Sequence, residues 1–453
     1  MIVVGGGQSG LVAARNVLSG GHSVIVLEAR ERVGGRIWGH ELKPGVVVER
    51  GGTFIGPTQD HLAALASELR VGTFPVYDSG NAVYYVDGQR TTYSDAGPLG
   101  SAPPDPTILA DLASVVGTVD EMAATIDVNA PWTHPQAAEW DAMTFEAFVA
   151  QNSTTSRFRE LATTVCRPIF GCEAHEISLL YTVFYVAASG NETNIGTFQR
   201  NFDTRNGAQQ DGFVGGSQRI PETIAAHLGE RVHLGQPVRR ITQHAGTVEV
   251  HTDHLTARGK RVIVACAPAL ADRIACEPGM PAQRDHLTQR EPMGQLVKVT
   301  AIYDKPFWRA QGLTGQTVSL DGLASVTFDD SPQQGGLGAL LAFVGGDSAR
   351  SYLAMGTHER EASVLGDLAN YFGPKARQPR QVIETLWPEE VYSRGCPVGL
   401  GIPGTLSAYG PSLREPVGSI HWAGTESSGY WNGYMDGAVR AGQRAATEVL
   451  AEL

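Results

Sequence analysis

Residues 1–38 read MIVVGGGQSGLVAARNVLSGGHSVIVLEARERVGGRIW. The apolar run Ile2–Val4 leads straight into a glycine-rich turn, a helix-compatible segment follows over Leu11–Leu18, and a second buried strand is expected over Val24–Leu27. A strand, a GxGxxG turn and a helix in this order are typical of a dinucleotide-binding unit. The opening stretch therefore predicts an α/β fold with a Rossmann-like core.

The three glycines of the motif, Gly5, Gly7 and Gly10, have separate physical roles. Gly5 allows the tight turn, Gly7 lets a pyrophosphate approach the backbone, and Gly10 lets the helix pack close to the sheet. The N-terminus of the helix then faces the phosphates with unpaired N–H groups and the positive end of its dipole. Gln8 and Ser9, within the motif, are assigned to the cofactor site as well.

Glu28 ends the second strand, 18 residues after Gly10. A carboxylate at this distance can accept both ribose hydroxyls of an adenine nucleotide, whereas an NADP site would favour a cation there. The acid and the glycine motif together predict dinucleotide binding.

The residues that follow Glu28 distinguish an FAD site from an NAD site. Residues 27–38, LEARERVGGRIW, resemble the second signature of the FAD-dependent amine oxidase superfamily. In that family the glycine pair passes close to the cofactor and the arginine neutralises its pyrophosphate. The resemblance implies FAD contacts at Ala29, Arg30, Gly34, Gly35 and Arg36.

A second glycine pair follows the apolar run Val46–Val48. Glycines at this place would let the backbone lie against a flat ring system, and an ordinary turn is the alternative interpretation. We assign four residues of this segment to the cofactor site: Gly51, Gly52, Thr53 and Phe54.

Residues 422–446, WAGTESSGYWNGYMDGAVRAGQRAA, resemble the carboxy-terminal signature of flavin monoamine oxidases. A helix that starts near Gly437 would direct its positive end at the flavin pyrimidine ring and stabilise negative charge there. In the family, the strands within residues 232–265 bring the backbone of Val238 to the adenine. The carboxy-terminal residues that the resemblance assigns to FAD are Gly424, Thr425, Glu426, Tyr434 and Met435.

Cys396 lies in the segment SRGCP, nine residues after Trp387. In monoamine oxidases a cysteine in this context forms a thioether with the flavin 8α-methyl group, and a tryptophan packs by the ring. A small buried thiol is the alternative, because putrescine oxidases of the same family can lack the cysteine and hold FAD non-covalently. The resemblance therefore implies FAD, with Cys396 as the candidate for covalent attachment.

Lys298 interrupts an apolar strand, and the strand pattern alone favours an outward-pointing side chain. The resemblance implies the opposite, since a lysine in this strand of the family hydrogen-bonds through water to flavin N5. The same resemblance makes Tyr434 one wall of an aromatic cage that faces the flavin. Lys298, Tyr434 and Trp387 are accordingly the candidate catalytic residues.

Position 397 departs from the family, because the second cage residue is usually a tyrosine and here it is Pro397. Half a cage weakens the alignment of an amine by aromatic faces. Gln209 and Val326 match positions that line or gate the family's substrate cavity, and Phe170 and Cys172 are additional candidates for its lining.

The composition restricts the class of protein. A chain of 453 residues exceeds the size of one core, so about two domains are expected. Lys plus Arg total 35 against 47 Asp plus Glu, and this net charge of −12 argues against nucleic acid and anionic membranes as partners. Five scattered cysteines, no signal peptide and no apolar span of 18 residues favour a cytoplasmic protein.

No metal site is expected. His244, His251 and His254 lie along predicted strands and turns without acid or thiol partners in a ligand pattern, so we interpret them as solvated side chains.

The predicted architecture is a discontinuous FAD-binding domain interleaved with an α+β substrate domain. The FAD domain combines a parallel sheet, helices and a β-meander over residues 1–79, 210–287 and 385–453, and the substrate domain takes 80–209 and 288–384. A hairpin about Asp87-Gly88 is expected over Asn81–Ser94. Predicted helices cover Thr107–Ile126, Thr144–Gln151, Ser156–Ile169, Ser178–Ala188 and His358–Phe372.

The resemblance implies oxidative deamination of a primary or N-substituted amine, with hydride transfer to FAD N5 and O₂ as the oxidant. The products are an aldehyde, ammonia and H₂O₂. Val326 supplies no acid for a distal ammonium, which favours a monoamine. A putrescine or polyamine oxidase, a secondary-amine oxidase, an amino-acid oxidase and a non-catalytic FAD-stabilised interaction protein stay open as alternatives, and so does a homodimer.

Overall fold

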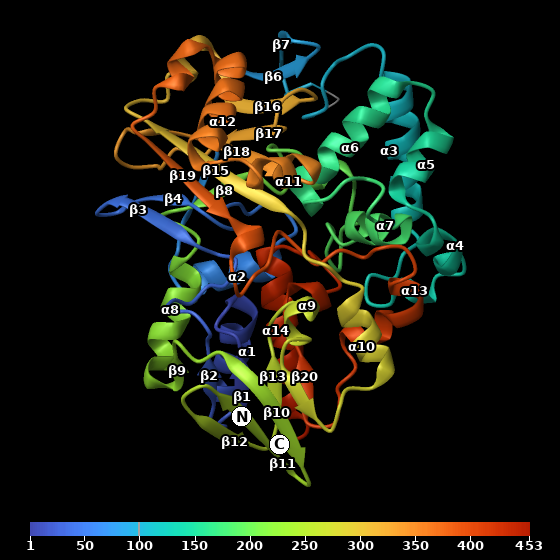
Figure 1. Ribbon diagram of the computed structural model, residues 1–453, viewed down its shortest axis with the longest axis vertical. Helices are drawn as coiled ribbons and strands as arrows, with labels where there is room; N and C mark the ends of the chain where they lie inside the picture. The colour runs from blue at the N-terminus through green and yellow to red at the C-terminus, as the bar shows by residue number, and fades with distance from the viewer. Residues whose placement is uncertain (98–99) are drawn as a thin grey trace.

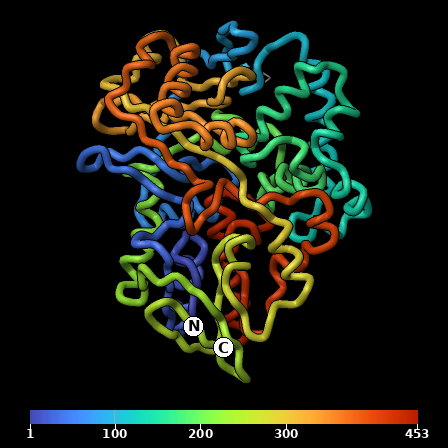
Figure 2. The backbone as a smooth tube through the Cα atoms, in the orientation of Figure 1, coloured from blue at the N-terminus to red at the C-terminus, as the bar shows by residue number. Residues whose placement is uncertain are grey.

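The computed structural model describes residues 1–97 and 100–453. Two halves lie one above the other in the view of Figure 1, with a parallel sheet in the lower half and a larger mixed sheet beside a group of helices in the upper half. Figure 2 shows that the chain passes between the halves more than once, since its first, middle and last segments all run through the lower half. The domain boundaries given above stay a prediction.

The lower half is built on a five-stranded parallel sheet. Its central strands are buried, as expected for a parallel sheet that is covered on both faces. The order of its strands is β20 (Ile420–Trp422), β13 (Val262–Val264), β1 (Ile2–Val4), β2 (Ile25–Leu27) and β9 (Val232–His233).

Two helices pack together on one face of this sheet, α1 (Gln8–Ser19) and α14 (Met435–Leu450). Their backbones approach closely, because a Cβ added at Gly442 would lie 2.3 Å from the carbonyl oxygen of Ser9. The first and last signatures of the sequence therefore meet in one layer. The sequence placed the start of α14 near Gly437, and the structure begins it two residues earlier.

The other face of the parallel sheet carries a four-stranded sheet. Ile2 and Leu27 of the parallel sheet pack there against Ile241 and Val250. The strand order is β12 (Thr256–Gly259), β11 (Thr247–Thr252), β10 (Val238–His244) and β14 (Ala275–Glu277).

The upper half contains a seven-stranded sheet in which β15 lies between β19 and β18. Helices α11 (Asp347–Leu353) and α12 (Thr357–Phe372) cover one face, on which Val297, Val299 and Ala301 are buried. The strand order is β19 (Gln381–Leu386), β15 (Leu296–Tyr303), β18 (Gly338–Gly345), β17 (Val326–Asp329), β16 (Leu313–Ser319), β6 (Asn81–Val86) and β7 (Gln89–Tyr93). The hairpin about Asp87-Gly88 is confirmed, with paired strands β6 and β7.

A helical lobe completes the upper half and shares one apolar core. Its α3 is shorter at both ends than the predicted Thr107–Ile126, whereas the other three predicted helices are shifted by at most one residue at either end. The lobe comprises α3 (Leu109–Ala123), α4 (Ala137–Ala142), α5 (Phe145–Asn152), α6 (Ser156–Phe170) and α7 (Leu179–Ala187).

Smaller elements connect these layers. The remaining strands are β3 (Gly39–Lys43), β4 (Val46–Glu49), β5 (Thr73–Pro75) and β8 (Asp211–Phe213). The remaining α-helices are α2 (Asp60–Glu68), α8 (Arg219–Leu228), α9 (Pro268–Ala271), α10 (Ala282–Gln289) and α13 (Leu406–Tyr409). Short 3₁₀ turns are η1 (Pro131–Thr133), η2 (Gln199–Asn201), η3 (Gly229–Arg231), η4 (Arg309–Gln311), η5 (Pro374–Arg377), η6 (Trp387–Glu389), η7 (Gly410–Leu413) and η8 (Thr425–Ser427).

Within the described ranges, no helix is both long and apolar enough to cross a bilayer. All five cysteines are free thiols.

Candidate active site

One cavity of about 720 Å³ is lined by residues of both halves of the molecule. At one end it is bordered by Glu28 of the segment after β2 and by Val238 of β10, and at the other by apolar side chains of α3 and α6. A single continuous space thus connects the glycine-rich turn with the helical lobe.

Backbone rather than side chains forms the wall at the first end. Gly5 has φ +104°, which L side chains rarely adopt, and a Cβ added at Gly10 would lie 2.0 Å from the carbonyl oxygen of Gly5. Gly34 donates its N–H to the carbonyl of Gly6 at 2.9 Å, so the two glycine turns lie against each other. Side chains larger than hydrogen would fill this part of the cavity or displace its walls.

Glu28 is held beside this wall. Its carboxylate accepts the N–H of Gly6 at 2.6 Å and the N–H of Arg30 at 2.9 Å, and it also borders the cavity. Ala29 and Val238 line the same region. A fixed carboxylate near exposed backbone is a suitable acceptor for the hydroxyl groups of a sugar.

Arg36 and Glu426 form a two-point ion pair behind the turn, with N–O distances of 2.6 and 3.1 Å. Arg36 also donates to the carbonyl oxygen of Pro397 at 2.7 Å. Burial lowers the pKa of Arg36, but the Glu426 carboxylate outweighs this and raises it, so the guanidinium is a permanent cation at the cavity wall. Arg30 instead bonds Glu390 and Ser393 from its place in the wall.

The second glycine pair lines the centre of the cavity together with Thr53 and Phe54. Lys298 reaches the same place from β15, where its Nζ donates to the carbonyl of Gly51 at 2.8 Å and to Oγ1 of Thr53 at 2.5 Å. Burial lowers the pKa of Lys298, and Asp330 and Glu49 oppose this change. Lys298 is therefore a buried amine with two fixed acceptors.

Two carboxyl groups lie behind Lys298. The N–H of Glu49 donates to Oδ2 of Asp330 at 3.2 Å, and Oε1 of Glu49 accepts the N–H of Ser217 at 2.6 Å. Burial raises the pKa of Glu49 to about 8, with Asp330 adding to the increase and Lys298 opposing it. Burial likewise raises the pKa of Asp330 to about 6.

Trp387 and Cys396 form a small apolar cluster with Leu296 at the cavity wall. The indole of Trp387 donates to the carbonyl of Arg50 at 3.0 Å, and its ring meets that of Trp38 edge-on at 6.3 Å. Burial raises the pKa of the Cys396 thiol to about 12, although Arg36 and Lys298 oppose the change.

Tyr434 lines the cavity immediately before α14. Its ring packs edge-on against Trp431 at 4.7 Å and lies 5.8 Å from the ring of Tyr185. Its hydroxyl donates to Oδ1 of Asn201 at 3.3 Å. Pro397 lies in the cavity wall at the position where the family pattern expects a second aromatic ring.

The sequence profile of the family "Flavin containing amine oxidoreductase" matches residues 8–450. The chain belongs to this family. It is therefore a flavin-dependent amine oxidoreductase, and its cofactor is FAD. The amine oxidase fold and the two signatures that suggested it are confirmed.

Individual relatives show the same similarity along the chain. The flavin-containing amine oxidase B of Sus scrofa is 39% identical over 457 residues, covering 99% of this chain and 86% of that protein. The structure of cyclohexylamine oxidase from Brevibacterium oxydans matches with a TM-score of 0.94 and 33% identity, covering 100% and 98% of the two chains. Putrescine oxidase bound to putrescine matches with a TM-score of 0.93 and 33% identity over 99% and 98%.

The residues of this amine oxidase fit a bound FAD. The glycine turns leave space next to exposed backbone, and both polar atoms of the Gln8 side chain are buried without a protein partner in the described structure. Ser9 accepts the N–H of Gly424 at 2.9 Å, which joins the amino-terminal and carboxy-terminal signatures beside that space. Thr425 and Met435 also line the cavity, whereas Gly10 and Glu426 support it from behind.

The outward orientation that strand alternation suggests for Lys298 is wrong. All eight residues of β15 are buried, because α12 covers one face of the strand and the segment with Gly51 and Thr53 covers the other. Alternation along a strand separates two faces but does not show whether either face meets solvent.

The predicted substrate-site residues differ in their positions. Gln209 and Val326 line the cavity, and Nε2 of Gln209 donates to the carbonyl of Asn201 at 3.0 Å. Phe170 instead faces a small neighbouring pocket and packs against Tyr185 at 4.7 Å. Cys172 is buried outside the residues that line either pocket.

The sequence interpretation missed the contribution of α6 to the cavity. The lining residues are spaced at three- and four-residue intervals, the spacing of one helix face, so the apolar periodicity of this helix was the signal that could have identified them. They are Phe158, Leu161, Ala162, Val165, Pro168 and Ile169. Asn201 at the end of η2 and Phe202 after it were missed as well, because short turns and loops give no such period.

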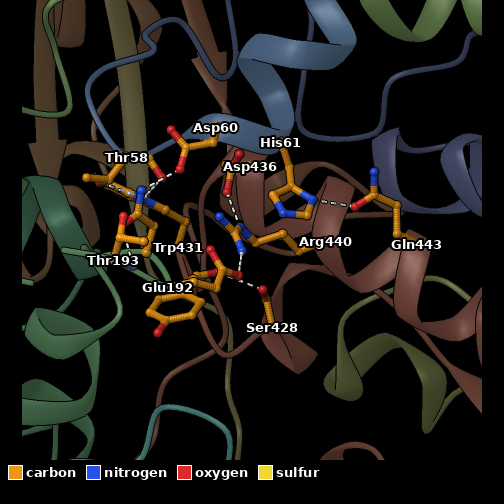
Figure 3. Close-up of polar contacts among 12 residues, drawn as sticks. Thr58, Asp60, His61, Glu192, Thr193, Ser428, Trp431, Asp436, Arg440 and Gln443 are labelled. Carbon is orange, nitrogen blue, oxygen red and sulfur yellow. Dashed lines mark hydrogen bonds and ion pairs between the residues drawn. The ribbon is translucent and has the colours of Figure 1, made fainter. Parts of the chain in front are cut away.

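A polar network at the start of α14 was also not predicted (Figure 3). Asp436 accepts the N–H of Leu62 at 2.7 Å and binds Arg440 at 2.6 Å, and Arg440 reaches Glu192 at 2.5 Å. The network joins the starts of α2 and α14 with the loop after α7, so it fixes the helix end next to Tyr434. Across the described residues, no group of three or more His, Cys, Asp or Glu could hold a metal ion.

Proposed function

We propose that this enzyme oxidises a primary monoamine whose α-carbon carries an apolar group. The observation that supports this proposal is the amine end of the cavity, where apolar side chains of α3, α6 and β17 predominate and Val326 stands at a wall position. Apolar walls favour an uncharged substrate body, because burying an unpaired ammonium is costly.

FAD, when bound, supplies the oxidation of the amine α-carbon and the transfer of electrons to O₂, with H₂O₂ as the product. We propose that the first glycine turn and Glu28 hold its adenosine and pyrophosphate with Ala29, Arg30, Arg36 and Val238. The second glycine pair, Thr53, Phe54 and the carboxy-terminal signature then border its ring system. The imine product leaves and hydrolyses to an aldehyde and ammonia.

Three side chains carry the proposed chemistry. Lys298 holds water beside the ring and supplies a proton when electrons pass to O₂. Tyr434 orients the neutral amine with its ring face, and Trp387 packs against the cofactor ring and excludes water. Cys396 is the proposed site of a thioether to the flavin. Gln209, Val326 and Pro397 border the amine, with Phe170 and Cys172 supporting the wall.

A second substrate class is favoured by one residue. Asp203 lines the cavity, and its Oδ1 accepts the N–H of Ser101 at 3.0 Å. A carboxylate there could bind the distal ammonium of a diamine. The structural relatives include both cyclohexylamine oxidase and putrescine oxidase, so the two classes define a direct comparison.

The test is anaerobic reduction of the enzyme-bound flavin by cyclohexylamine, an arylalkylamine, an N-methylated amine and putrescine. We expect rapid bleaching by the apolar primary amines and H₂O₂ on admission of air. Preferential bleaching by putrescine, abolished by Asp203→Asn, would replace the monoamine proposal with the diamine class. An oxidised spectrum after every amine would contradict both and favour a non-catalytic, FAD-stabilised protein.

We further propose that the enzyme works in the cytoplasm, since its five thiols are unpaired. The proposed domain division assigns residues 1–79, 210–287 and 385–453 to the FAD half. Limited proteolysis of holoenzyme tests the first of these boundaries, with early cleavage expected at the exposed residues 79 and 80.

A further inference from the structure

Two residues with unusual backbone conformations meet beside Tyr434. Thr58 has φ +67° and Trp431 has φ +50°, a region that β-branched and bulky residues rarely adopt. Such conformations persist only where the surrounding contacts hold them, and they cluster at functional sites. Two such residues side by side therefore indicate a position with a functional role.

The two residues are hydrogen-bonded to each other, as Figure 3 shows. The indole N–H of Trp431 lies 3.0 Å from the carbonyl oxygen of Thr58 and 3.2 Å from its Oγ1. Trp431 is 1% exposed, so this bond lies in a setting that water does not reach. Loss of either acceptor would leave a buried indole N–H with a weaker partner.

Both residues are also anchored to the end of α7. The hydroxyl of Thr58 lies 2.8 Å from the carbonyl oxygen of Ser189, and the backbone N–H of Trp431 donates to the carbonyl of Ala188 at 2.7 Å. The segment before α2, the end of α7 and the segment before α14 are thereby joined at one point. Rotation of the indole would break its bond to Thr58, while the backbone bond to Ala188 holds the main chain of Trp431 at the end of α7.

The indole in turn supports the cavity wall. The ring of Tyr434 meets Trp431 at 4.7 Å with an interplanar angle of 82°, and the N–H of Tyr434 donates to the carbonyl of Trp431 at 3.0 Å. Gly433, between them, has φ +84°. The orientation of the tyrosine ring thus depends on where the indole is held.

Position 397 makes this dependence stronger. Because Pro397 occupies the place of a second aromatic wall, the enzyme orients its amine with the ring of Tyr434 and has no opposing ring at position 397 to compensate for a tilt.

We propose that Thr58 and Trp431 form a clamp that sets the angle of the Tyr434 ring and thereby aligns the amine α-carbon with FAD. The clamp residues are positioning residues, since they act through Tyr434. An asparagine or glycine at position 58 would adopt positive φ more easily, but neither supplies a hydroxyl that contacts both the indole and α7. The proposal rests on amine oxidation at FAD, as described above.

The test uses holoenzyme variants Trp431→Phe, which keeps a ring but removes the indole N–H, and Thr58→Ala, which removes Oγ1. Since a misplacement of about 1 Å can cost about 100-fold in rate, we expect both to slow anaerobic flavin reduction at saturating amine by at least about tenfold. FAD content and the rate of flavin reoxidation by O₂ should stay within about twofold of wild type, because neither depends on the amine. Thr58→Ser, which restores the hydroxyl, should recover most of the reduction rate.

Two comparisons separate positioning from a loss of folding. Trp422→Phe removes a similar buried indole bond, 3.0 Å from the carbonyl of Glu415, outside the cavity lining, and should leave flavin reduction unchanged. In a Tyr434→Ala background, Thr58→Ala should slow reduction no further, because two residues acting through one contact are not additive. The clamp would be overturned if Thr58→Ala slowed flavin reduction as much in the Tyr434→Ala background as in wild type. It would also be overturned if a clamp variant slowed flavin reduction and flavin reoxidation equally.

Flavin reduction in the wild-type enzyme by the same amine, measured in parallel, tests the substrate proposal separately from the clamp. If wild type is not reduced, the proposed substrate is wrong. If wild type is reduced and both clamp variants are reduced at the same rate, the clamp itself is wrong.

Discussion

The cofactor end of the cavity is lined mainly by backbone atoms, whereas its amine end is lined by side chains. At the cofactor end, glycines place backbone atoms directly against the space, and a Cβ at Gly10 would come within 2.0 Å of a carbonyl oxygen. At the amine end the walls are side chains from α3, α6, α7 and the seven-stranded sheet. A wall of backbone tolerates almost no change, whereas a wall of side chains can be altered one position at a time.

The two kinds of wall are compatible with one family whose members are named for different amines. The family profile spans residues 8–450, yet the similar structures are named for cyclohexylamine and putrescine. Amine preference can change through a few side chains while the cofactor end stays fixed.

The largest effect is expected from Gly10→Ala, which attacks the backbone wall. The added carbon would meet the carbonyl of Gly5 at 2.0 Å, so the turn must move and FAD binding should be lost. Flavin absorbance per purified chain measures this. Gly117→Ala in α3, where a Cβ meets nothing within 4 Å, is the control and should raise stability by about 0.5–1 kcal/mol. Full FAD content in Gly10→Ala would contradict the contrast between the two ends.

Cys396→Ala tests whether the cofactor end is joined covalently. We expect acid-precipitated wild-type protein to retain its flavin colour and the variant to release free FAD, because the thioether would be absent. Cys276→Ala, a thiol outside the cavity lining, should retain the colour. Release of FAD from wild type would leave Cys396 as a buried apolar wall residue.

Lys298→Met tests the buried lysine where the cofactor end and the amine end of the cavity meet. Because the ammonium would no longer supply a proton beside the flavin, we expect reoxidation by O₂ to slow by about 100-fold, within the range of general acid catalysis. Flavin reduction by the amine should change much less. Stopped-flow mixing of reduced enzyme with O₂ measures the first rate, with the exposed Lys305→Met as control. Equal slowing of both half-reactions would contradict this role.

Val326→Asp alters the side-chain wall without touching the backbone wall. A carboxylate in the apolar amine end should favour a substrate with a distal ammonium. A hydrogen bond between the two charges contributes about 1.5–3 kcal/mol, which corresponds to at least about tenfold in selectivity. The measurement is kcat/KM for putrescine relative to cyclohexylamine. Val326→Asn is the uncharged control. Loss of FAD from Val326→Asp would show that the ends are not independent.

The smallest effect concerns the carboxyl groups behind Lys298. Burial raises the pKa of Glu49 from 4.5 to about 8, so the folded protein holds a proton that the unfolded chain loses. Stability should therefore decline as pH rises from about 4.5 to about 8. Glu49→Gln should make this decline shallower, as measured by urea unfolding at several pH values. Glu41→Gln, at an exposed position, is the control and should show the wild-type dependence of stability on pH. The same dependence in Glu49→Gln would show that Glu49 does not hold the extra proton.

Local signals predicted elements in both halves of the molecule. The turn with Gly5 and Gly7 lies between β1 and α1, and the Asp87-Gly88 hairpin joins β6 to β7. These features depend on residues within a few positions of each other, for which glycine conformations and apolar periodicity give direct information. Phe170 and Cys172 lie outside the lining of the main cavity, because a shift of one or two residues moves a side chain to another face of α6 or past its end.

The amino-acid sequence by itself determined the strand–helix–strand unit, the two FAD signatures and the family, because each is written in contiguous residues with fixed spacing. Only the tertiary structure decided that the amine of Lys298 bonds Gly51 and Thr53, that Glu49 bonds Asp330, and that Trp431 bonds Thr58. Their partners lie far apart along the chain and come from separate segments. Such contacts depend on how whole layers pack, which no local pattern encodes.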